Sequence, residues 1–249
     1  MPLTVHQFPC LSDNYGFLIR DEATGKVATI DTPDAAAIQA ELDKLGWSLD
    51  LILNTHWHPD HAGGNEALKK ATGATIAGPA EVTRIAPLDR ILRGGDTIAL
   101  GETKFDVIDS GGHTLGHIAF HDAADSIAFV GDTLFALGCG RLFEGTAEQM
   151  WESLGRVAGL PDETIVYCAH EYTASNARFA LSVDDHPALK ARADQIFAAR
   201  ERGEPTVPTT IAAEKATNPF LRAPLLRPDA ASPAQAFAEI RAAKDSFKG

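Results

Sequence analysis

The chain has 249 residues, 45% of them apolar, and its 34 acidic against 22 basic residues give a formal charge of −12. This length suits one large domain, or a medium domain with a small one. The negative field repels phosphate backbones and anionic lipid headgroups, so we expect no nucleic-acid partner and no membrane partner. A small anionic substrate would need a local cationic patch to offset this field.

The N-terminal sequence and the cysteines indicate a cytoplasmic protein. The N-terminus, MPLTVHQFPC, lacks the basic region and apolar core of a secretory signal. No apolar run reaches the roughly 18 residues that a transmembrane helix needs. The cysteines, Cys10, Cys139 and Cys168, are widely spaced and odd in number, so we expect a reducing compartment rather than disulfides. Cys139 and Cys168 are expected to be buried thiols.

The first two-thirds of the chain predict short strands mixed with a few helices. Strands are expected at 14–20, 26–31, 50–55, 74–78, 104–109, 117–121, 126–130 and 164–168. Helices are expected from Thr32-Pro33 to Gly46, from about Asn65, and over 147–159 behind a capping box of Thr146 and Gln149. These elements predict an α/β domain that ends near residue 174.

The last 75 or so residues predict a helical region. Leu189, Ala193, Ile196 and Phe197 recur at the spacing of one helix face. Ser232 followed by Pro233 predicts the start of a final helix. We therefore expect two domains, a metal-binding catalytic domain over 1–174 and a helical domain over 175–249.

Three imidazoles and a carboxylate follow the apolar segment 50–55. The sequence THWHPDH contributes His56, His58, Asp60 and His61. A continued strand would point His61 away from the other three, whereas a turn at Pro59 would let Asp60 and His61 reach a second ion. Zinc, iron and manganese all accept these donors. One isolated histidine would be an ordinary surface or core residue, but this cluster would be costly to desolvate without a metal.

Three further candidate ligands each follow an apolar, strand-like run. They are His113, Asp132 and His170. Because polar groups at strand ends tend to converge at one rim of a sheet, we expect these three to join the first cluster. Two ions need about seven or eight protein ligands, and this set reaches seven.

Other polar residues are expected to lie outside the ligand set. His117 is expected beside the ligands without binding metal, while His6, His121 and His186 are expected elsewhere. Asp31 closes a predicted strand, and two roles stay open for it. It either hydrogen-bonds to a ligand or is a plain turn carboxylate.

Five stretches resemble the glyoxalase II (hydroxyacylglutathione hydrolase) family of the metallo-β-lactamase superfamily. They are THWHPDHAGGN (55–65), GHTLGHI (112–118), GDTLFALGCGRLFEGT (131–146), CAHEYT (168–173) and NPFLR (218–222). The HxHxDH pattern alone marks the superfamily, whereas the GCGRLFEGT and AHEYT stretches are narrower. The resemblance covers nearly the whole chain and implies an αββα sandwich with a helical C-terminal domain that helps to bind glutathione.

The resemblance also implies two metal ions per chain. The first ion would be held by His56, His58, His113 and Asp132. The second would be held by Asp60, His61, Asp132 and His170, with Asp132 bridging the two. Zinc is the first expectation, and iron or manganese are the alternatives. Asp60 and Asp132 would be the catalytic residues.

For substrate binding, the resemblance implies five residues that contact glutathione. They are Arg141, Phe143, Tyr172, Arg241 and Lys244. Arg241, Lys244 and Lys248 would share one cationic face of the last helix. Without the resemblance, these cations would be assigned to the helix dipole instead. Some family members have a tyrosine where this chain has Phe143, which cannot supply a phenolic hydrogen bond.

The implied reaction is hydrolysis of a glutathione thioester such as S-D-lactoylglutathione by a metal-bridged hydroxide, the second step of methylglyoxal detoxification. The enzyme is expected to be a monomer. One alternative is a mononuclear-iron glutathione persulfide dioxygenase, which keeps HxHxDH but binds one ion with two histidines and one aspartate. A non-catalytic metal-binding protein is another, although structural zinc sites usually close with four ligands. Lactonase and nuclease relatives are weaker alternatives.

Overall fold

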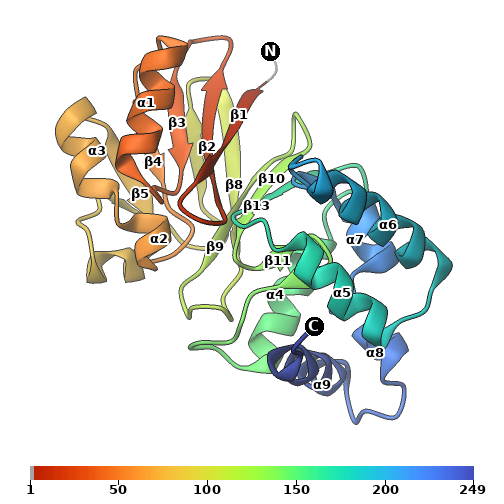
Figure 1. The fold of residues 1–249 in the computed structure, drawn as a ribbon. Helices are drawn as coiled ribbons and strands as arrows, with labels where there is room; N and C mark the ends of the chain where they lie inside the picture. The colour runs from red at the N-terminus through yellow and green to blue at the C-terminus, as the bar shows by residue number, and fades with distance from the viewer. Residues whose placement is uncertain (1–2) are drawn as a thin grey trace. The chain divides into compact units, whose positions relative to one another are not determined.

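The structure is a computed structural model that describes residues 3–249, with a mixed α/β architecture (Figure 1). The chain divides into two compact units that interleave along the sequence. The first unit holds the residues up to Asp109 together with Gly116–Gly131, and the second holds Ser110–Leu115 and Asp132–Gly249. Among the described residues, no helix is long and apolar enough to span a membrane.

The first unit contains a sheet in the order β1-β2-β3-β4-β5-β6. Its strands are β1 (Leu3–Cys10), β2 (Asn14–Asp21), β3 (Val27–Ile30), β4 (Leu51–Leu53), β5 (Thr75–Gly78) and β6 (Arg90–Ile91). The first three strands pair antiparallel, and β3 to β6 pair parallel. The helices of this unit are α1 (Ala35–Leu45), α2 (Pro59–Ala62), α3 (Asn65–Thr72) and the 3-10 helix η1 (Ala80–Arg84).

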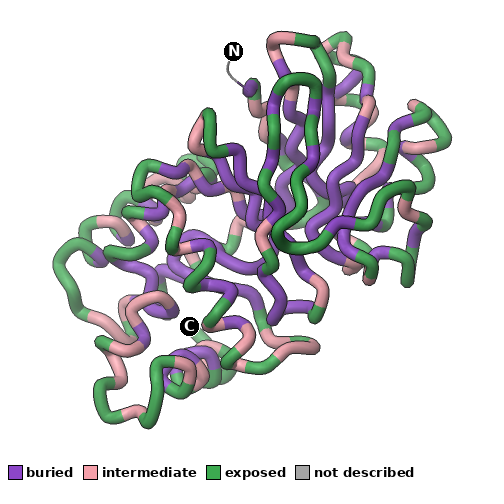
Figure 2. Tube along the Cα trace, turned by 180° about the vertical axis from the view of Figure 1, so that it is seen from behind, coloured by how far each residue is buried: buried purple, intermediate pink, exposed green. Residues whose placement is uncertain are grey.

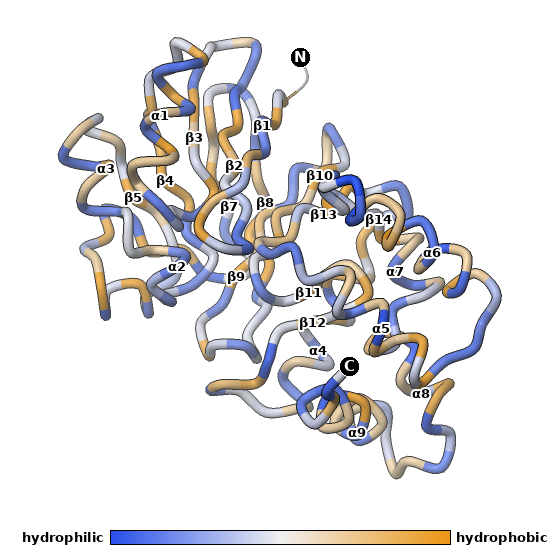
Figure 3. The backbone as a smooth tube through the Cα atoms, in the orientation of Figure 1, coloured by the Kyte–Doolittle hydropathy of each residue, from blue (hydrophilic) through white to orange (hydrophobic). Residues whose placement is uncertain are grey.

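A hydrophobic cluster joins α1 and α3 to this sheet. Ile38 and Leu42 of α1 and Leu68 of α3 are buried against Leu18 and Ile52 of the strands. The buried segments of the chain follow the strands, and the exposed residues lie mainly in the turns and on the outer sides of the helices (Figure 2). Hydropathy follows the same division (Figure 3). Burial of these apolar faces stabilises the layer.

A second, antiparallel run of strands in the same unit faces the first sheet. It consists of β7 (Thr97–Leu100), β8 (Thr103–Asp109), β9 (Ile118–Asp122) and β10 (Ile127–Gly131). The ring of Phe17 in β2 meets that of Phe129 in β10 with centroids 5.7 Å apart. At one end of the sandwich, the Thr103 backbone N–H donates to Asp21 at 2.8 Å. The segment that carries His56, His58, Asp60 and His61 follows β4 directly after Leu53.

The second unit is mainly helical. Its elements are the hairpin β11 (Leu134–Phe135) and β12 (Gly138–Cys139), α4 (Ala147–Ala158), β13 (Ile165–Cys168), α5 (Thr173–Val183), α6 (Pro187–Glu201), β14 (Thr209–Thr210), α7 (Ile211–Thr217), α8 (Ala223–Leu226) and α9 (Pro233–Ser246). Trp151 of α4 contacts Phe237 of α9 with ring centroids 6.3 Å apart. On α6, Leu189, Ala193 and Ile196 are buried, which confirms the predicted helix face.

The α/β class and the eight predicted strands are confirmed, with ends shifted by one or two residues. The strand β1 was not predicted, because its burial pattern has no clean alternation. The capping box of Thr146 and Gln149 is confirmed. The domains predicted over 1–174 and 175–249 stay predictions.

Two helix ends differ from the predictions. The cap of α1 is Asp34, whose side chain accepts from the backbone N–H groups of Ala36 and Ala37. Thr32 was the predicted cap, but its hydroxyl donates to Asn65 instead, at 2.8 Å. The last helix ends at Ser246, so Lys248 is not on its cationic face.

Candidate metal centre and substrate cavity

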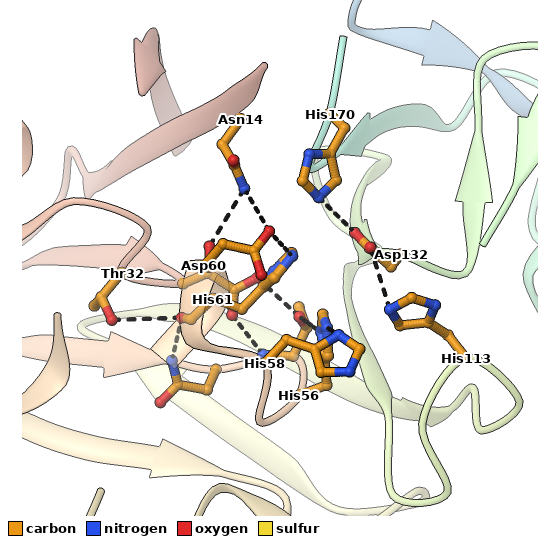
Figure 4. A network of polar contacts seen from close by, with 12 residues as sticks. Asn14, Thr32, His56, His58, Asp60, His61, His113, Asp132 and His170 are labelled. Atoms are coloured by element: carbon orange, nitrogen blue, oxygen red, sulfur yellow. Dashed lines mark hydrogen bonds and ion pairs between the residues drawn. The ribbon is translucent and has the colours of Figure 1, made fainter. Parts of the chain in front are cut away.

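In the first unit, four predicted ligands lie together where the chain leaves β4 (Figure 4). His56 and His61 are buried, while His58 and Asp60 are half-buried. The His56 ring lies with its centroid 4.0 Å from that of His61 and 4.7 Å from that of His58. Pro59 begins the short helix α2, where its missing N–H breaks no helical hydrogen bond. The turn therefore returns Asp60 and His61 toward the strand end, as predicted.

Asp31 orients two of these rings. Its carboxylate accepts from the Thr55 backbone N–H at 2.7 Å, the Thr55 hydroxyl at 2.8 Å and His61 Nδ1 at 2.8 Å. Because Thr55 gives its one hydroxyl proton to Asp31, its oxygen accepts from His56 Nδ1, 3.0 Å away. In a neutral ring, Nε2 of both His56 and His61 then carries the lone pair. Of the two roles left open for Asp31, the structure shows the hydrogen bond to His61.

The Nε2 atoms of His56 and His61, which carry these lone pairs, each lie close to another potential metal-ligating atom. His56 Nε2 lies 3.0 Å from His58 Nδ1, and His61 Nε2 lies 3.5 Å from Asp60 Oδ2. Asn14 donates to the Asp60 carboxylate at 3.1 Å and to its backbone carbonyl at 3.3 Å. Nitrogen and carboxylate donors at these separations are stabilised by a shared proton or a shared cation. The donor set suits a divalent transition metal.

In the second unit, Asp132 lies between two buried histidines (Figure 4). His113 Nε2 lies 3.3 Å from Asp132 Oδ2, and His170 Nε2 lies 3.3 Å from Asp132 Oδ1. His113 Nδ1 lies 2.8 Å from the Arg141 carbonyl oxygen, which can only accept, so Nδ1 carries the proton and Nε2 the lone pair. Each carboxylate oxygen therefore faces one imidazole, an arrangement suited to a carboxylate that contacts two cations.

The other histidines lie as the sequence predicted. His117 is buried in the first unit and stacks on His56 with ring centroids 4.7 Å apart. His6 pairs with Glu41, and His186 precedes α6. His121 lies in β9, and burial lowers its pKa below the usual value.

A cavity of about 470 Å³ in the second unit brings the predicted substrate residues together. Its lining includes all five of them, namely Arg141, Phe143, Tyr172, Arg241 and Lys244. His113 and Asp132 line it too. The cavity therefore joins two predicted metal ligands to a concentration of positive charge in an acidic protein.

Arg241 is the most buried cation of this cavity. Its side chain lies over the Phe220 ring, 4.9 Å from the centroid. One guanidinium nitrogen donates to the Cys139 carbonyl at 3.0 Å, and another to the Asp245 carboxylate at 2.9 Å. These contacts fix the planar group on the cavity wall.

Lys244 is half-buried one turn further along α9. Its ammonium donates to the backbone carbonyl and the hydroxyl of Ser175, both at 3.1 Å. Burial, helped by the positive charges of Arg241 and Arg141, lowers the pKa of Lys244 to about 8. Its charge is therefore sensitive to small changes in its surroundings.

Three aromatic residues of the cavity lining, Phe135, Phe143 and Tyr172, contact candidate ligands of the second unit or one another. Tyr172 stacks on His170 with centroids 4.7 Å apart and planes 2° from parallel. Phe135 meets the His170 and Tyr172 rings edge-on, at 5.9 Å and 5.4 Å. Phe143 is 62% exposed and contacts the His113 ring at 5.2 Å.

Cys139 and Cys168 are buried free thiols, as predicted, and Cys10 is a buried free thiol as well. Burial raises the pKa of Cys10 and Cys168 to about 12 and that of Cys139 to about 11. A protonated thiol is a poor nucleophile, so these side chains do not support covalent catalysis.

Sequence reasoning missed two residues that hold the predicted groups. Asn14 holds Asp60, and Ser175 holds Lys244. Asn14 begins β2 and carried no motif signal, because its partner is distant in sequence. Ser175 lies within a helix close to the CAHEYT stretch, but only the folded chain shows that its carbonyl faces Lys244.

Two protein-family models match adjacent parts of the chain. The metallo-beta-lactamase superfamily matches residues 17–170, and the hydroxyacylglutathione hydrolase C-terminus matches residues 171–247. The chain is 54% identical over 250 residues to a hydroxyacylglutathione hydrolase of Erythrobacter litoralis (strain HTCC2594), covering 98% of this chain and 100% of the relative. It is 56% identical over 253 residues to the hydroxyacylglutathione hydrolase of Maricaulis maris (strain MCS10), covering 98% and 99%.

Solved structures share the fold. The crystal structure of ETHE1 from Myxococcus xanthus is 28% identical, with a TM-score of 0.69 over 96% of this chain and 90% of that one. The crystal structure of TTHA1623 in a di-iron-bound form is 25% identical, with a TM-score of 0.64 over 88% of this chain and 100% of that one.

Proposed function

The chain belongs to the hydroxyacylglutathione hydrolase family of the metallo-β-lactamase superfamily and is a thioester hydrolase. We propose that its substrates are S-(2-hydroxyacyl)glutathiones such as S-D-lactoylglutathione. One observation supports this substrate most directly. The cavity of the second unit gathers Arg141, Arg241 and Lys244 beside His113 and Asp132. Glutathione is anionic, and its thioester must lie near the metal ligands.

The family and the clusters of histidine and aspartate indicate that the chain binds divalent metal. We propose two ions per chain, zinc in the first instance. The first would be held by His56, His58, His113 and Asp132, and the second by Asp60, His61, Asp132 and His170. The match to residues 17–170 includes all seven side chains, which supports this assignment.

Two bound divalent ions would supply a hydroxide near neutral pH and a Lewis acid for the thioester carbonyl. The chain's own groups orient this chemistry. Asn14 fixes the Asp60 carboxylate, which would help to hold the attacking hydroxide. A thiolate is a good leaving group, so the reaction needs no strong general acid from the chain.

In the cavity, we propose that Arg241 and Lys244 bind the glycine carboxylate of glutathione, while Arg141 and Tyr172 contact the peptide. Charge-assisted hydrogen bonds of this kind are about twice as strong as neutral ones. The positive charge of this local patch offsets the negative field of a chain whose net charge is −12, so an anionic substrate can bind there. We further propose a cytoplasmic monomer.

The test compares two thioesters on metal-loaded protein, S-D-lactoylglutathione and the same lactoyl thioester of N-acetylcysteamine. Loss of thioester absorbance gives the rates. We expect kcat/KM to be at least about a hundredfold higher for the glutathione thioester, because remote binding energy lowers the barrier. Equal values would contradict the assignment of the cavity to glutathione. Oxygen uptake with glutathione persulfide and no thioester hydrolysis would favour the dioxygenase alternative.

A further inference from the structure

The hairpin of β11 and β12 contains a buried residue in an unfavourable backbone conformation. Leu137 has a φ of 55°, a region that residues other than glycine rarely occupy. Its side chain is fully buried. A conformation of this kind persists where surrounding groups hold it, and it concentrates near functional sites.

Asn218, which follows α7, holds both sides of this turn. Its side-chain amide donates to the carbonyls of Phe135 at 3.1 Å and Gly138 at 2.9 Å. Its carbonyl oxygen accepts from the Phe220 backbone N–H at 2.9 Å, and this donor defines which end of the amide faces the turn. Asn218 is fully buried, so these carbonyls have no water to replace it.

Glu214 holds the strained residue itself. Its carboxylate accepts from the Leu137 backbone N–H at 2.9 Å. It also lies 2.9 Å from the Asn218 amide nitrogen, whose two hydrogens it shares with the Phe135 and Gly138 carbonyls. The other carboxylate oxygen accepts from Thr209 at 2.6 Å and pairs with Arg192. A fully buried carboxylate is stable only when paired and hydrogen-bonded, and here one of its bonds fixes the turn.

Asn176 of α5 completes the set. Its amide donates to the Ala136 carbonyl at 3.1 Å. This approach requires a glycine at position 138, because a Cβ there would lie 2.3 Å from the amide nitrogen of Asn176. Three buried side chains from the C-terminal segment thus bind successive backbone groups of one short turn.

Residues at both ends of the turn contact proposed metal ligands and substrate-binding residues. Phe135 at its start contacts the His170 and Tyr172 rings edge-on. The backbone carbonyl of Cys139, at its end, accepts a hydrogen bond from Arg241. Two residues later, the Arg141 carbonyl accepts from His113. Movement of the hairpin would therefore disturb the contacts of His170, Arg241 and His113.

We propose that Asn218, with Glu214 and Asn176, acts as a positioning residue of the hydrolase by holding the hairpin that aligns Phe135, Cys139 and Arg141. The proposal rests on the proposed function. Asn218 does not line the cavity, so its effect passes through the backbone of the hairpin. Asn218 would thus couple the segment after α7 to the positions of Phe135, Cys139 and Arg141.

The test uses the metal-loaded enzyme and the variant Asn218→Ala. Backbone amide hydrogen exchange at Leu137, metal content, and kcat and KM for S-D-lactoylglutathione are measured together. We expect faster exchange at Leu137 and a fall in kcat/KM of about tenfold or more in protein that still binds its metal. Asp184→Ala is the matched control, since it removes a buried carboxylate that pairs with Arg222 at 2.9 Å and bonds neither to the hairpin nor to the three side chains that hold it. We expect it to lower the melting temperature without changing kcat/KM.

Gly138→Ala is the second variant, in case Asn218→Ala fails to fold. Its methyl group would displace Asn176 and leave Asn218 in place, so we expect a smaller loss of kcat/KM of the same kind. Unchanged Leu137 exchange, or wild-type kcat and KM in either folded variant, would overturn the positioning role. A wild-type enzyme that does not cleave the thioester would instead overturn the proposed function, while the exchange measurement would still test the hold on the hairpin.

Discussion

The two units present their candidate ligands in different ways. In the first unit, His56 and His61 lie in one short motif and are oriented by a side chain, the carboxylate of Asp31, directly and through Thr55. In the second unit, the ligands come from distant segments, and His113 is oriented by a backbone carbonyl. Side-chain orientation can be removed by one substitution, whereas backbone orientation depends on how the surrounding chain is held. Substitutions of Asp132 and Asp31 test the ligands of the two units and have the largest expected effects, and substitutions of Lys244 and Phe143 test the cavity of the second unit.

The largest effect is expected for Asp132→Ala. Asp132 is the one carboxylate that faces two imidazoles in the second unit, so its loss removes the negative charge that His113 and His170 share. We expect loss of both metals and a fall in kcat/KM of about a thousandfold or more, the scale of removing a preorganised charge-stabilising group. Metal analysis and the thioester assay on one sample check this. Full activity with normal metal content would refute the bridging role.

Asp31→Asn tests orientation by a side chain in the first unit. An amide cannot accept all the bonds that the carboxylate accepts from Thr55 and His61. We expect metal affinity, measured by competition with a chelator, to fall about 10–100-fold, the usual effect of removing a group that orients a metal-bound histidine. Asp34→Asn is the control, because asparagine also caps a helix and Asp34 bonds only within α1. Equal affinities for the two variants would remove the proposed role of Asp31.

Lys244 tests the charge of the cavity. Its pKa is lowered to about 8, so the ammonium is present below that pH and is lost as pH rises through it. Arg241, Arg141 and Arg178 lower this pKa, and Asp245 opposes them. We expect KM for the glutathione thioester to rise above pH 8 with little change in kcat, since the lost interaction binds the remote part of the substrate.

Variants of Lys244 separate charge from packing. Lys244→Arg should keep the low KM and shift its rise to higher pH, because guanidinium does not titrate in this range. Lys244→Ala should raise KM about tenfold or more at pH 7, as loss of a charged hydrogen bond predicts. A KM that is independent of pH and of both substitutions would contradict the carboxylate-binding role.

Phe143→Tyr is expected to have the smallest effect. The ring is 62% exposed, so a new phenolic hydrogen bond to substrate would compete with water. We expect KM to fall by about twofold to threefold, with kcat unchanged. Steady-state kinetics on the two proteins in parallel measures this. An increase in KM would show that the bare ring contributes more to binding than the hydroxyl would.

The sequence predicted the ligand clusters better than the groups that hold them. His56 to His61 could be recognised because their residue types and spacing carry the chemistry. The roles of the Arg141 carbonyl and of Asn218 could not, because backbone acceptors have no residue signature and their partners are distant in the chain. Asn218 lies in the NPFLR stretch that supported the family resemblance, but the stretch alone does not show what its amide contacts.

The two wrong helix ends have the same kind of cause. Thr32 and Asp34 are both good capping residues. Asp34 caps the helix because the Thr32 hydroxyl donates instead to Asn65, 33 positions away in the sequence. Lys248 has the helical spacing of Arg241 and Lys244, but the helix ends at Ser246, and Phe247 has an extended backbone. Local pattern predicted that these elements exist, and contacts between distant segments set where they end.

The most direct test of the central claim is to determine metal per chain and hydrolysis of S-D-lactoylglutathione on the same protein sample. We predict about two divalent ions per chain and fast loss of thioester absorbance, with activity lost on chelation and restored by adding metal. One ion per chain and no hydrolysis would contradict the proposed binuclear hydrolytic centre.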